Sequence, residues 1–155
     1  MGLWIIGVVG LLFLMQRTWP PGIPMPDLRW TYTARDLNRW LALLDPGARR
    51  WFGLWHLTLD LLWPLVYGTL LLKGTRWLAS RRPLARGLPA LVVLVVLSDL
   101  VENGALALYA WKVPRAPVAL AWLAVRATTL KWTLLVLLVL GSLRALLQRS
   151  APRSS

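Results

Sequence analysis

The chain has 155 residues, of which 57% are hydrophobic and only 15% charged, and its mean hydropathy is +0.57. Because a soluble domain carries about 25% charged residues, this composition indicates a single domain embedded in a membrane. The net charge of +12 does not indicate nucleic-acid binding, because most basic residues flank apolar segments, where they suit anionic lipid headgroups.

The first predicted element is a membrane-crossing helix over residues 3–19. A crossing helix needs about 20 mostly apolar residues, and this segment approaches that length. It lacks the basic start and the small-residue cleavage site of a secretory signal peptide, and Trp19-Pro20-Pro21 follows it. We therefore expect a retained helix.

A short amphipathic helix is predicted over residues 34–44, after a proline-rich stretch that cannot be helical. Thr33 can cap its start, and Leu37 and Leu41 recur at helical spacing on one face. This pattern predicts a helix lying at the outer membrane interface. Its role is either that of an anchor or that of a lid over a cavity that opens outward.

Three further apolar segments are long enough to cross a membrane, over residues 51–72, 88–110 and 118–141. Together with the first helix they predict an all-α fold, a bundle of four transmembrane helices with the interfacial helix between the first two. One domain would occupy residues 1–149. Residues 150–155 are expected to form a frayed tail.

The distribution of basic residues predicts the orientation. The connection 73–86 holds five Lys or Arg and no acid, so the positive-inside rule places it, and both termini, in the cytoplasm. The connection 16–50 opposes this assignment, because it carries six Arg on the outer side. The prediction is an integral, multi-pass membrane protein with both termini cytoplasmic.

Ionisable side chains interrupt three of the crossing segments at a similar depth. Asp60, Asp99 and Lys131 fall near the midpoints of their segments. A charge at the bilayer centre costs at least about 2.5–3.5 kcal/mol, so we expect these side chains to meet in the bundle interior. Further polar residues are displaced towards one membrane face by about a turn: His56, Glu102, Asn103 and Arg126.

Two interpretations of this cluster remain open. The first is structural: ion pairs such as Asp60–Lys131 and Glu102–Arg126 would fix the register of the helices. The second is a functional polar pocket, which we favour because buried pairs can often be replaced by apolar residues without loss of stability. Pro64 leaves the backbone carbonyl of Asp60 without its helical donor, which predicts a kink beside that acid.

Motifs of soluble enzymes are absent from the sequence. It contains no Gly-rich phosphate loop, no nucleophile elbow and no H-E-x-x-H segment. The lack of cysteine excludes disulfides and thiolate catalysis, and one histidine with six acids leaves little for a metal site. We expect no cofactor and no metal.

Two motifs carry a resemblance to known proteins. The stretch from Asp60 through Pro64 to Tyr67-Gly68 reads D-x-x-x-P-x-x-Y-G, and Asp99 to Asn103 reads D-x-x-E-N. Together they resemble a family of small, uncharacterised bacterial four-helix membrane proteins. The resemblance covers about residues 25–110. It implies the same architecture and a bacterial inner membrane, but no activity.

A looser resemblance is to the EXPERA superfamily, which includes the sigma-two receptor and the emopamil-binding sterol isomerase. In those helical bundles, intramembrane acids sit in a pocket for sterols or cationic amphiphiles, and the isomerase shifts a ring double bond by proton transfer. The acid and proline of the second helix, the segment 72–77 and an acid on the third helix are similar. The first helix has no acid, however, and Arg126 and Lys131 add cations that disfavour a cationic ligand.

The sequence therefore predicts a pocket between the second, third and fourth crossing helices for an apolar, isoprenoid or sterol-like molecule. The protein would act as a binder, or as an enzyme that isomerises or cyclises this ligand by proton transfer. Asp60, Asp99 and Glu102 are the candidate catalytic residues. Further ligand contacts are expected from His56, Trp63, Tyr67, Asn103, Arg126, Thr129 and Lys131.

Two other functions fit the same pattern. A small proton-coupled transporter would use the acids and bases as a relay, and would have to be an oligomer because four helices contain no inverted repeat. A structural subunit of a larger membrane complex would use the charges for assembly. The expected partners are accordingly a membrane lipid or apolar small molecule, a second copy in a homodimer, or a membrane-complex partner.

Overall fold

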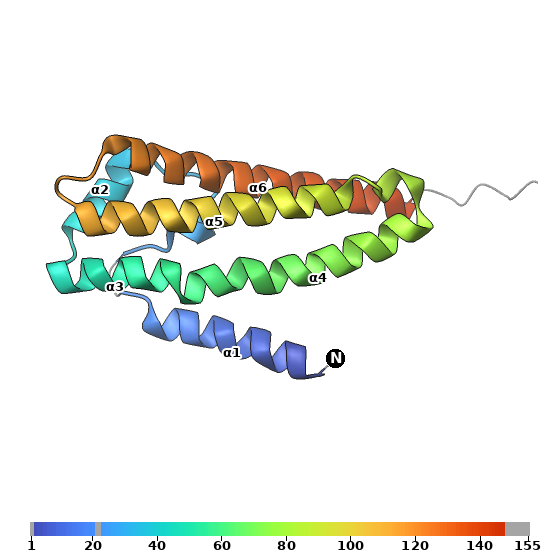
Figure 1. Cartoon of the computed structure of the whole chain (residues 1–155), viewed down its shortest axis with the longest axis horizontal. Coiled ribbons are helices and arrows are strands. Elements are labelled where there is room, and N and C mark those ends of the chain that lie inside the picture. Colours follow the sequence, from blue (N-terminus) through green and yellow to red (C-terminus); the bar gives the residue numbers. More distant parts are fainter. Residues whose placement is uncertain (1, 21–22, 148–155) are drawn as a thin grey trace, which may run out of the picture.

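The computed structural model describes residues 2–20 and 23–147, and all regular secondary structure in these ranges is helical (Figure 1). The predicted tail at 150–155 lies outside the described residues. The elements are α1 (Gly2–Thr18), η1 (Pro26–Leu28), α2 (Ala34–Ala42), α3 (Pro46–Leu57), α4 (Leu59–Arg81), η2 (Pro83–Ala85), α5 (Leu88–Lys112) and α6 (Val118–Leu147), where η marks a 3-10 turn.

The long helices lie side by side and alternate in direction (Figure 1). The helices α4, α5 and α6 form an antiparallel layer, and α1 runs back along α3 and α4. The start of α1, the connection between α4 and α5, and the end of α6 share one end of the bundle. The helix α2, the start of α3 and the connection between α5 and α6 share the other.

Within residues 2–20 and 23–147, two stretches are long and apolar enough to cross a membrane, Pro83–Lys112 and Val118–Leu147. Only 33% and 22% of the residues in their apolar windows are buried inside the protein, whereas the core helix of a soluble protein is mostly buried. The all-α prediction is confirmed, and the third and fourth predicted segments meet this criterion. The first and second do not: α1 has only 17 residues, and α4, although 23 residues long, carries charged residues at Asp60, Lys73 and Arg76.

The helix predicted over 51–72 is interrupted at Thr58, two residues before the acid beside which a kink was predicted. Thr58 has φ −117° and ψ −84°, outside the helical region, and its hydroxyl donates to the carbonyl oxygen of Leu54 at 2.7 Å. Pro64 itself remains inside α4. Proline cannot donate to the carbonyl four residues earlier and its ring crowds that carbonyl, so the disturbance falls in the preceding turns rather than at Pro64.

The helix α2 begins with the capping box that the sequence indicates. The amide of Asp36 donates to the Thr33 hydroxyl at 3.1 Å, and the Asp36 carboxylate accepts from the Thr33 amide at 2.9 Å and from its hydroxyl at 2.7 Å. These hydrogen bonds hold the pKa of Asp36 below its ordinary value of 3.8. The capping box therefore stabilises α2 fully at a pH above that value. This stabilisation is lost as the pH falls below it and the carboxylate takes up a proton.

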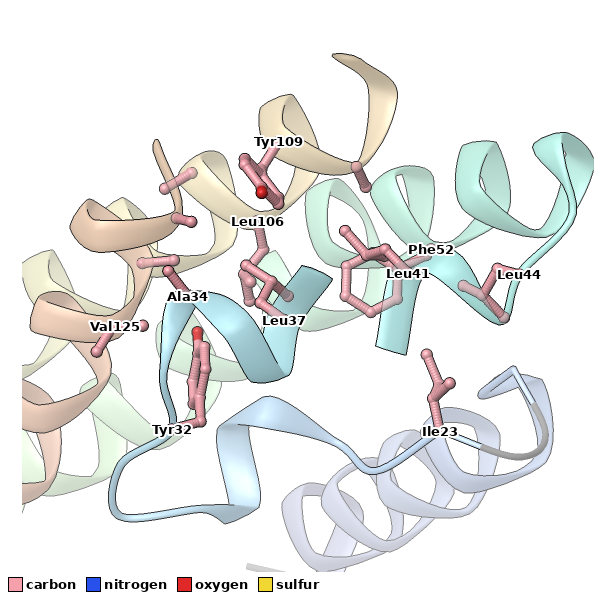
Figure 2. Packing of buried hydrophobic residues seen from close by; sticks show 14 residues of the cluster. Ile23, Tyr32, Ala34, Leu37, Leu41, Leu44, Phe52, Leu106, Tyr109 and Val125 are labelled. Atoms are coloured by element: carbon pink, nitrogen blue, oxygen red, sulfur yellow. The ribbon is translucent and has the colours of Figure 1, made fainter. Parts of the chain in front are cut away.

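The apolar face of α2 packs on the protein and not on lipid (Figure 2). Leu37 and Leu41 are fully buried, against residues of α3, α5 and α6 that include Phe52 and Leu106. The prediction that this face anchors α2 in the membrane interface is therefore wrong. The connection between α1 and α3, which includes α2, folds back over the end of the bundle. The apolar side chains of α2 are therefore buried against the other helices.

Close packing of α4 on α5 gives a test at Gly68, the last residue of the D-x-x-x-P-x-x-Y-G motif. A Cβ atom at Gly68 would overlap Cγ2 of Val96, a β-branched side chain with little rotamer freedom. We expect Gly68→Ala to lower the free energy of unfolding by about 1–3 kcal/mol through overpacking. Gly74→Ala on the same helix meets no atom within 4 Å and should stabilise by up to about 1 kcal/mol. Unfolding in denaturing detergent, followed by circular dichroism, measures the free energy of unfolding of both variants. Equal changes in the two variants would contradict the prediction.

Candidate functional site

Three charged side chains from α5 and α6 form a buried ion-pair triad. The Nζ atom of Lys131 lies 3.0 Å from Oδ1 of Asp99 and 2.7 Å from Oε2 of Glu102. Asp99 and Glu102 are separated by about one turn of α5, so both carboxyls reach the same ammonium. Each of the three side chains is at most 4% exposed. The structure thus brings together charges that the depth argument placed near one another.

A hydroxyl group binds the other oxygen of each carboxyl. Tyr67 of α4 donates to Oδ2 of Asp99 at 2.6 Å, and Thr128 of α6 donates to Oε1 of Glu102 at 2.6 Å. Each carboxyl therefore has one oxygen near the ammonium of Lys131 and the other on a hydroxyl. Such charge-assisted bonds are the strongest hydrogen bonds in proteins, and they fix the direction of each carboxyl.

A second acid–base pair lies within a few residues of the helix break. Nδ1 of His56, on α3, is 2.7 Å from Oδ2 of Asp60, on α4, and both side chains are buried. The rings of Phe52, Trp55 and Trp19 surround the imidazole, with centroids 4.5, 5.2 and 5.9 Å away. The carboxylate and the three rings together fix the orientation of the imidazole.

The amide of Asn103 joins this pair to the backbone. Its Nδ2 donates to the carbonyl oxygen of Asp60 at 3.1 Å, and its Oδ1 lies 3.3 Å from Nδ1 of His56. The Asp60 carbonyl is the one that Pro64 leaves without a helical donor. The second motif, D-x-x-E-N, therefore supplies the hydrogen bond that the proline of the first motif removes.

The polar cluster opens into a cleft of about 520 Å³. Its ionisable lining residues are Asp60, Tyr67, Asp99 and Lys131. Apolar and aromatic side chains form the rest of the wall: Leu12 and Met15 of α1, Leu28 of η1, Trp55 of α3, Trp63, Leu70 and Leu71 of α4, and Trp132 and Leu135 of α6. Clefts of 300–1,000 Å³ with apolar walls and a few convergent polar groups are typical ligand sites.

Three predicted site residues lie behind the wall of this cleft. Glu102, His56 and Asn103 are fully buried and are not among the described residues that line it. Glu102 is rotated about 60° from Asp99 around α5 and faces Thr128. The structure therefore places these three side chains behind the cleft wall, in contact with Asp60, Thr128 and Lys131, and their predicted role towards a ligand stays a prediction.

Arg126 and Thr129 do not reach the cleft either. Arg126 is exposed on another face of α6, with its guanidinium carbon 5.8 Å from the centroid of the Trp122 ring. Thr129 donates to the carbonyl of Val125 at 3.0 Å. Five residues separate Arg126 from Lys131, which is about 140° around a helix, so both cannot face the same interior. The predicted ion pair of Arg126 with Glu102 is wrong for the same reason.

Some contributors to the site were not predicted. Thr128 lies three residues before Lys131 and shares its face, so its position on the helix could have indicated its role. Tyr32, whose hydroxyl is 3.3 Å from that of Thr128, comes from the connection before α2. Leu12 and Met15 show that α1 forms part of the cleft wall. No periodic pattern in the sequence indicates how these segments fold back.

Chemically, the site offers carboxyl, phenol and ammonium groups to a molecule in an apolar cleft. Among the described residues, no three His, Cys, Asp or Glu side chains gather closely enough to hold a metal ion. Comparison with protein-family models, with curated proteins and with solved structures found no match for the chain. The functional argument therefore rests on the geometry of the site.

Proposed function

We propose that the chain is an integral protein of a bacterial inner membrane that crosses the bilayer four times, through α1, the α3–α4 pair, α5 and α6. The surface of α5 and α6 supports this, because large apolar side chains such as Leu97, Leu130 and Leu137 are about half exposed while the charged triad is inside. The positive-inside rule places the end with η2 and the two termini in the cytoplasm.

We further propose that the cleft binds an apolar, lipid-like molecule of the isoprenoid or sterol type. The observation that carries this proposal is the cleft wall, in which Asp60, Asp99, Tyr67 and Lys131 project into an otherwise apolar surface. The apolar wall would hold the hydrocarbon body of the ligand. The polar residues would orient one functional group or one double bond.

The balance of charges supports a role in proton transfer. Three carboxyl groups face only two basic side chains, since Arg126 lies elsewhere. To act as an acid towards a ligand, one of these carboxyl groups would have to hold a proton before the reaction. A carboxylic acid kept neutral by its surroundings can protonate a ligand, as in enzymes that shift double bonds.

As an enzyme, the protein would isomerise or cyclise its ligand without a redox step. Asp60 or Asp99 would give a proton to an alkene carbon, and the resulting cation would lose a proton from a neighbouring carbon to a second carboxylate. The proposal agrees with the resemblance to the EXPERA superfamily. His56 and Glu102 would act as positioning residues, through Asp60 and Lys131 respectively.

Ligand binding is tested by analysing the lipids that co-purify with the full chain in mild detergent. Leu135→Trp should fill the cleft, whereas Leu137→Trp adds the same side chain to the exposed surface of the same helix. We expect one apolar species to be enriched with the wild type and with Leu137→Trp, and lost with Leu135→Trp. Only bulk phospholipid in all three samples, or unchanged enrichment in Leu135→Trp, would overturn the binding proposal.

Proton transfer is tested with that species in deuterated water. An isomerase or cyclase that protonates carbon should introduce deuterium into the lipid, which mass spectrometry detects. Tyr67→Phe and Asp99→Asn should slow the incorporation, because both change groups that line the cleft. If the wild type binds the lipid but introduces no deuterium, the protein is a binder or carrier and not an isomerase.

A further inference from the structure

A second apolar groove runs along α5 and α6, on another face of α6 from the cleft. It has a volume of about 390 Å³. Its walls include Leu94, Leu97 and Val101 of α5 and Leu123, Leu130 and Leu134 of α6. Most of these side chains are about half exposed, so the groove faces outward and not into the core.

The charged residue of this groove is Arg126. It lies eight residues into α6, or about 12 Å from the start of the helix, so it lies within the membrane-crossing part of α6. Its contact among the described residues is with the ring of Trp122, one turn nearer to the end of the bundle. No described carboxylate pairs with it. Lipid chains cannot solvate a guanidinium, so the side chain is expected to extend towards Trp122 and the headgroup level, where an anionic group can pair with it.

We propose that this groove is a binding site for an anionic phospholipid, with the phosphate on Arg126 and an acyl chain along the groove. Arginine is suited to phosphate because its planar fork donates two parallel hydrogen bonds. The ring of Trp122 lies at the level where aromatic side chains meet headgroups. The site is separate from the cleft and goes beyond the function proposed for it.

A second copy of the chain fits this face less well. A symmetric contact would place two Arg126 side chains at the same interface. The acids of the crossing helices could not reach them, since Asp60, Asp99 and Glu102 are buried. An anionic lipid supplies the missing charge, and its hydrocarbon chain matches the groove.

Native mass spectrometry of the full chain in neutral detergent tests this proposal, with dioleoyl phosphatidylglycerol and dioleoyl phosphatidylcholine added in equal amounts. The wild type should retain phosphatidylglycerol preferentially. Arg126→Gln should reduce that preference about tenfold, the usual loss when a hydrogen bond to a charged group is removed. Arg144→Gln, which removes the same charge from the exposed end of the same helix, should leave the preference unchanged.

The remaining outcomes decide against the site. If Arg126→Gln and Arg144→Gln lose the preference for phosphatidylglycerol equally, the preference comes from general electrostatic attraction and not from this site. If Arg126→Gln keeps the full preference, the proposal is overturned directly. A wild-type dimer that Arg126→Gln converts to a monomer, without a change in lipid preference, would assign the face to a second copy. Arg126→Gln should retain the apolar species of the cleft, so failure of this proposal is distinguishable from failure of the function proposed for the cleft.

Discussion

Replacing Lys131 by methionine is expected to lower the free energy of unfolding by about 3–5 kcal/mol, the usual cost of removing one partner from a buried ion pair. The substitution keeps the length and apolar stem of the side chain but leaves the carboxyls of Asp99 and Glu102 without the ammonium that lies within 3.0 Å of each. Reversible unfolding of the purified chain in denaturing detergent, followed by circular dichroism, measures the change.

Two comparisons isolate the charge. Lys112→Met removes an exposed lysine at the end of α5 and should change stability little. Adding Asp99→Asn and Glu102→Gln to the Lys131→Met variant should recover much of the loss, because both orphaned carboxyls are then neutral. A Lys131→Met protein as stable as the wild type would show that the triad does not hold α5 to α6.

Replacing Asn103 by leucine is expected to cost about 1–3 kcal/mol for each buried polar group that it leaves unsatisfied. The variant removes the donor to the Asp60 carbonyl and the amide oxygen near His56. Leucine branches at the same atom but is larger, so overpacking at this fully buried position adds to the cost. The same unfolding measurement reports the change.

The substitution Pro64→Ala supplies a specific control for this prediction. An alanine at position 64 restores a backbone N–H that can donate to the carbonyl of Asp60. Asn103→Leu should therefore cost less in the Pro64→Ala background than in the wild type, and the double-mutant cycle gives the coupling. Equal costs in both backgrounds would mean that Asn103 does not compensate for the proline.

The all-α fold and the meeting of charges could be predicted because both depend on regular helix geometry. The rise per residue is fixed, so Asp60, Asp99 and Lys131 could be assigned a common depth, and all three line the cleft. Rotation around the helix is equally regular. The five-residue spacing between Arg126 and Lys131 indicates that their side chains point to different faces of α6. In the structure Lys131 lies in the buried triad, and Arg126 lies on an exposed face beside Trp122.

The connections could not be predicted in the same way. Tyr32 and Leu28 reach the cluster and the cleft from the irregular segment between α1 and α2, whose course is set by tertiary packing. The face of α2 reads equally well as a membrane-binding or a protein-binding surface, since both need the same apolar residues. The break at Thr58 was predicted only approximately, as a kink beside Asp60, because the hydrogen bond that Pro64 removes locates the disturbance to a turn of the helix and not to one residue.

Under the membrane topology proposed above, the triad has a consequence for how the chain is inserted during synthesis. The acids of α5 leave the ribosome before their lysine, which lies on α6, and each acid makes solitary entry of α5 into the bilayer costly. Only residues 113–117 separate the two helices. We therefore expect α5 and α6 to partition from the translocon together, as a helical hairpin, and a nascent chain that stops after α5 to be integrated less efficiently than one that includes Lys131.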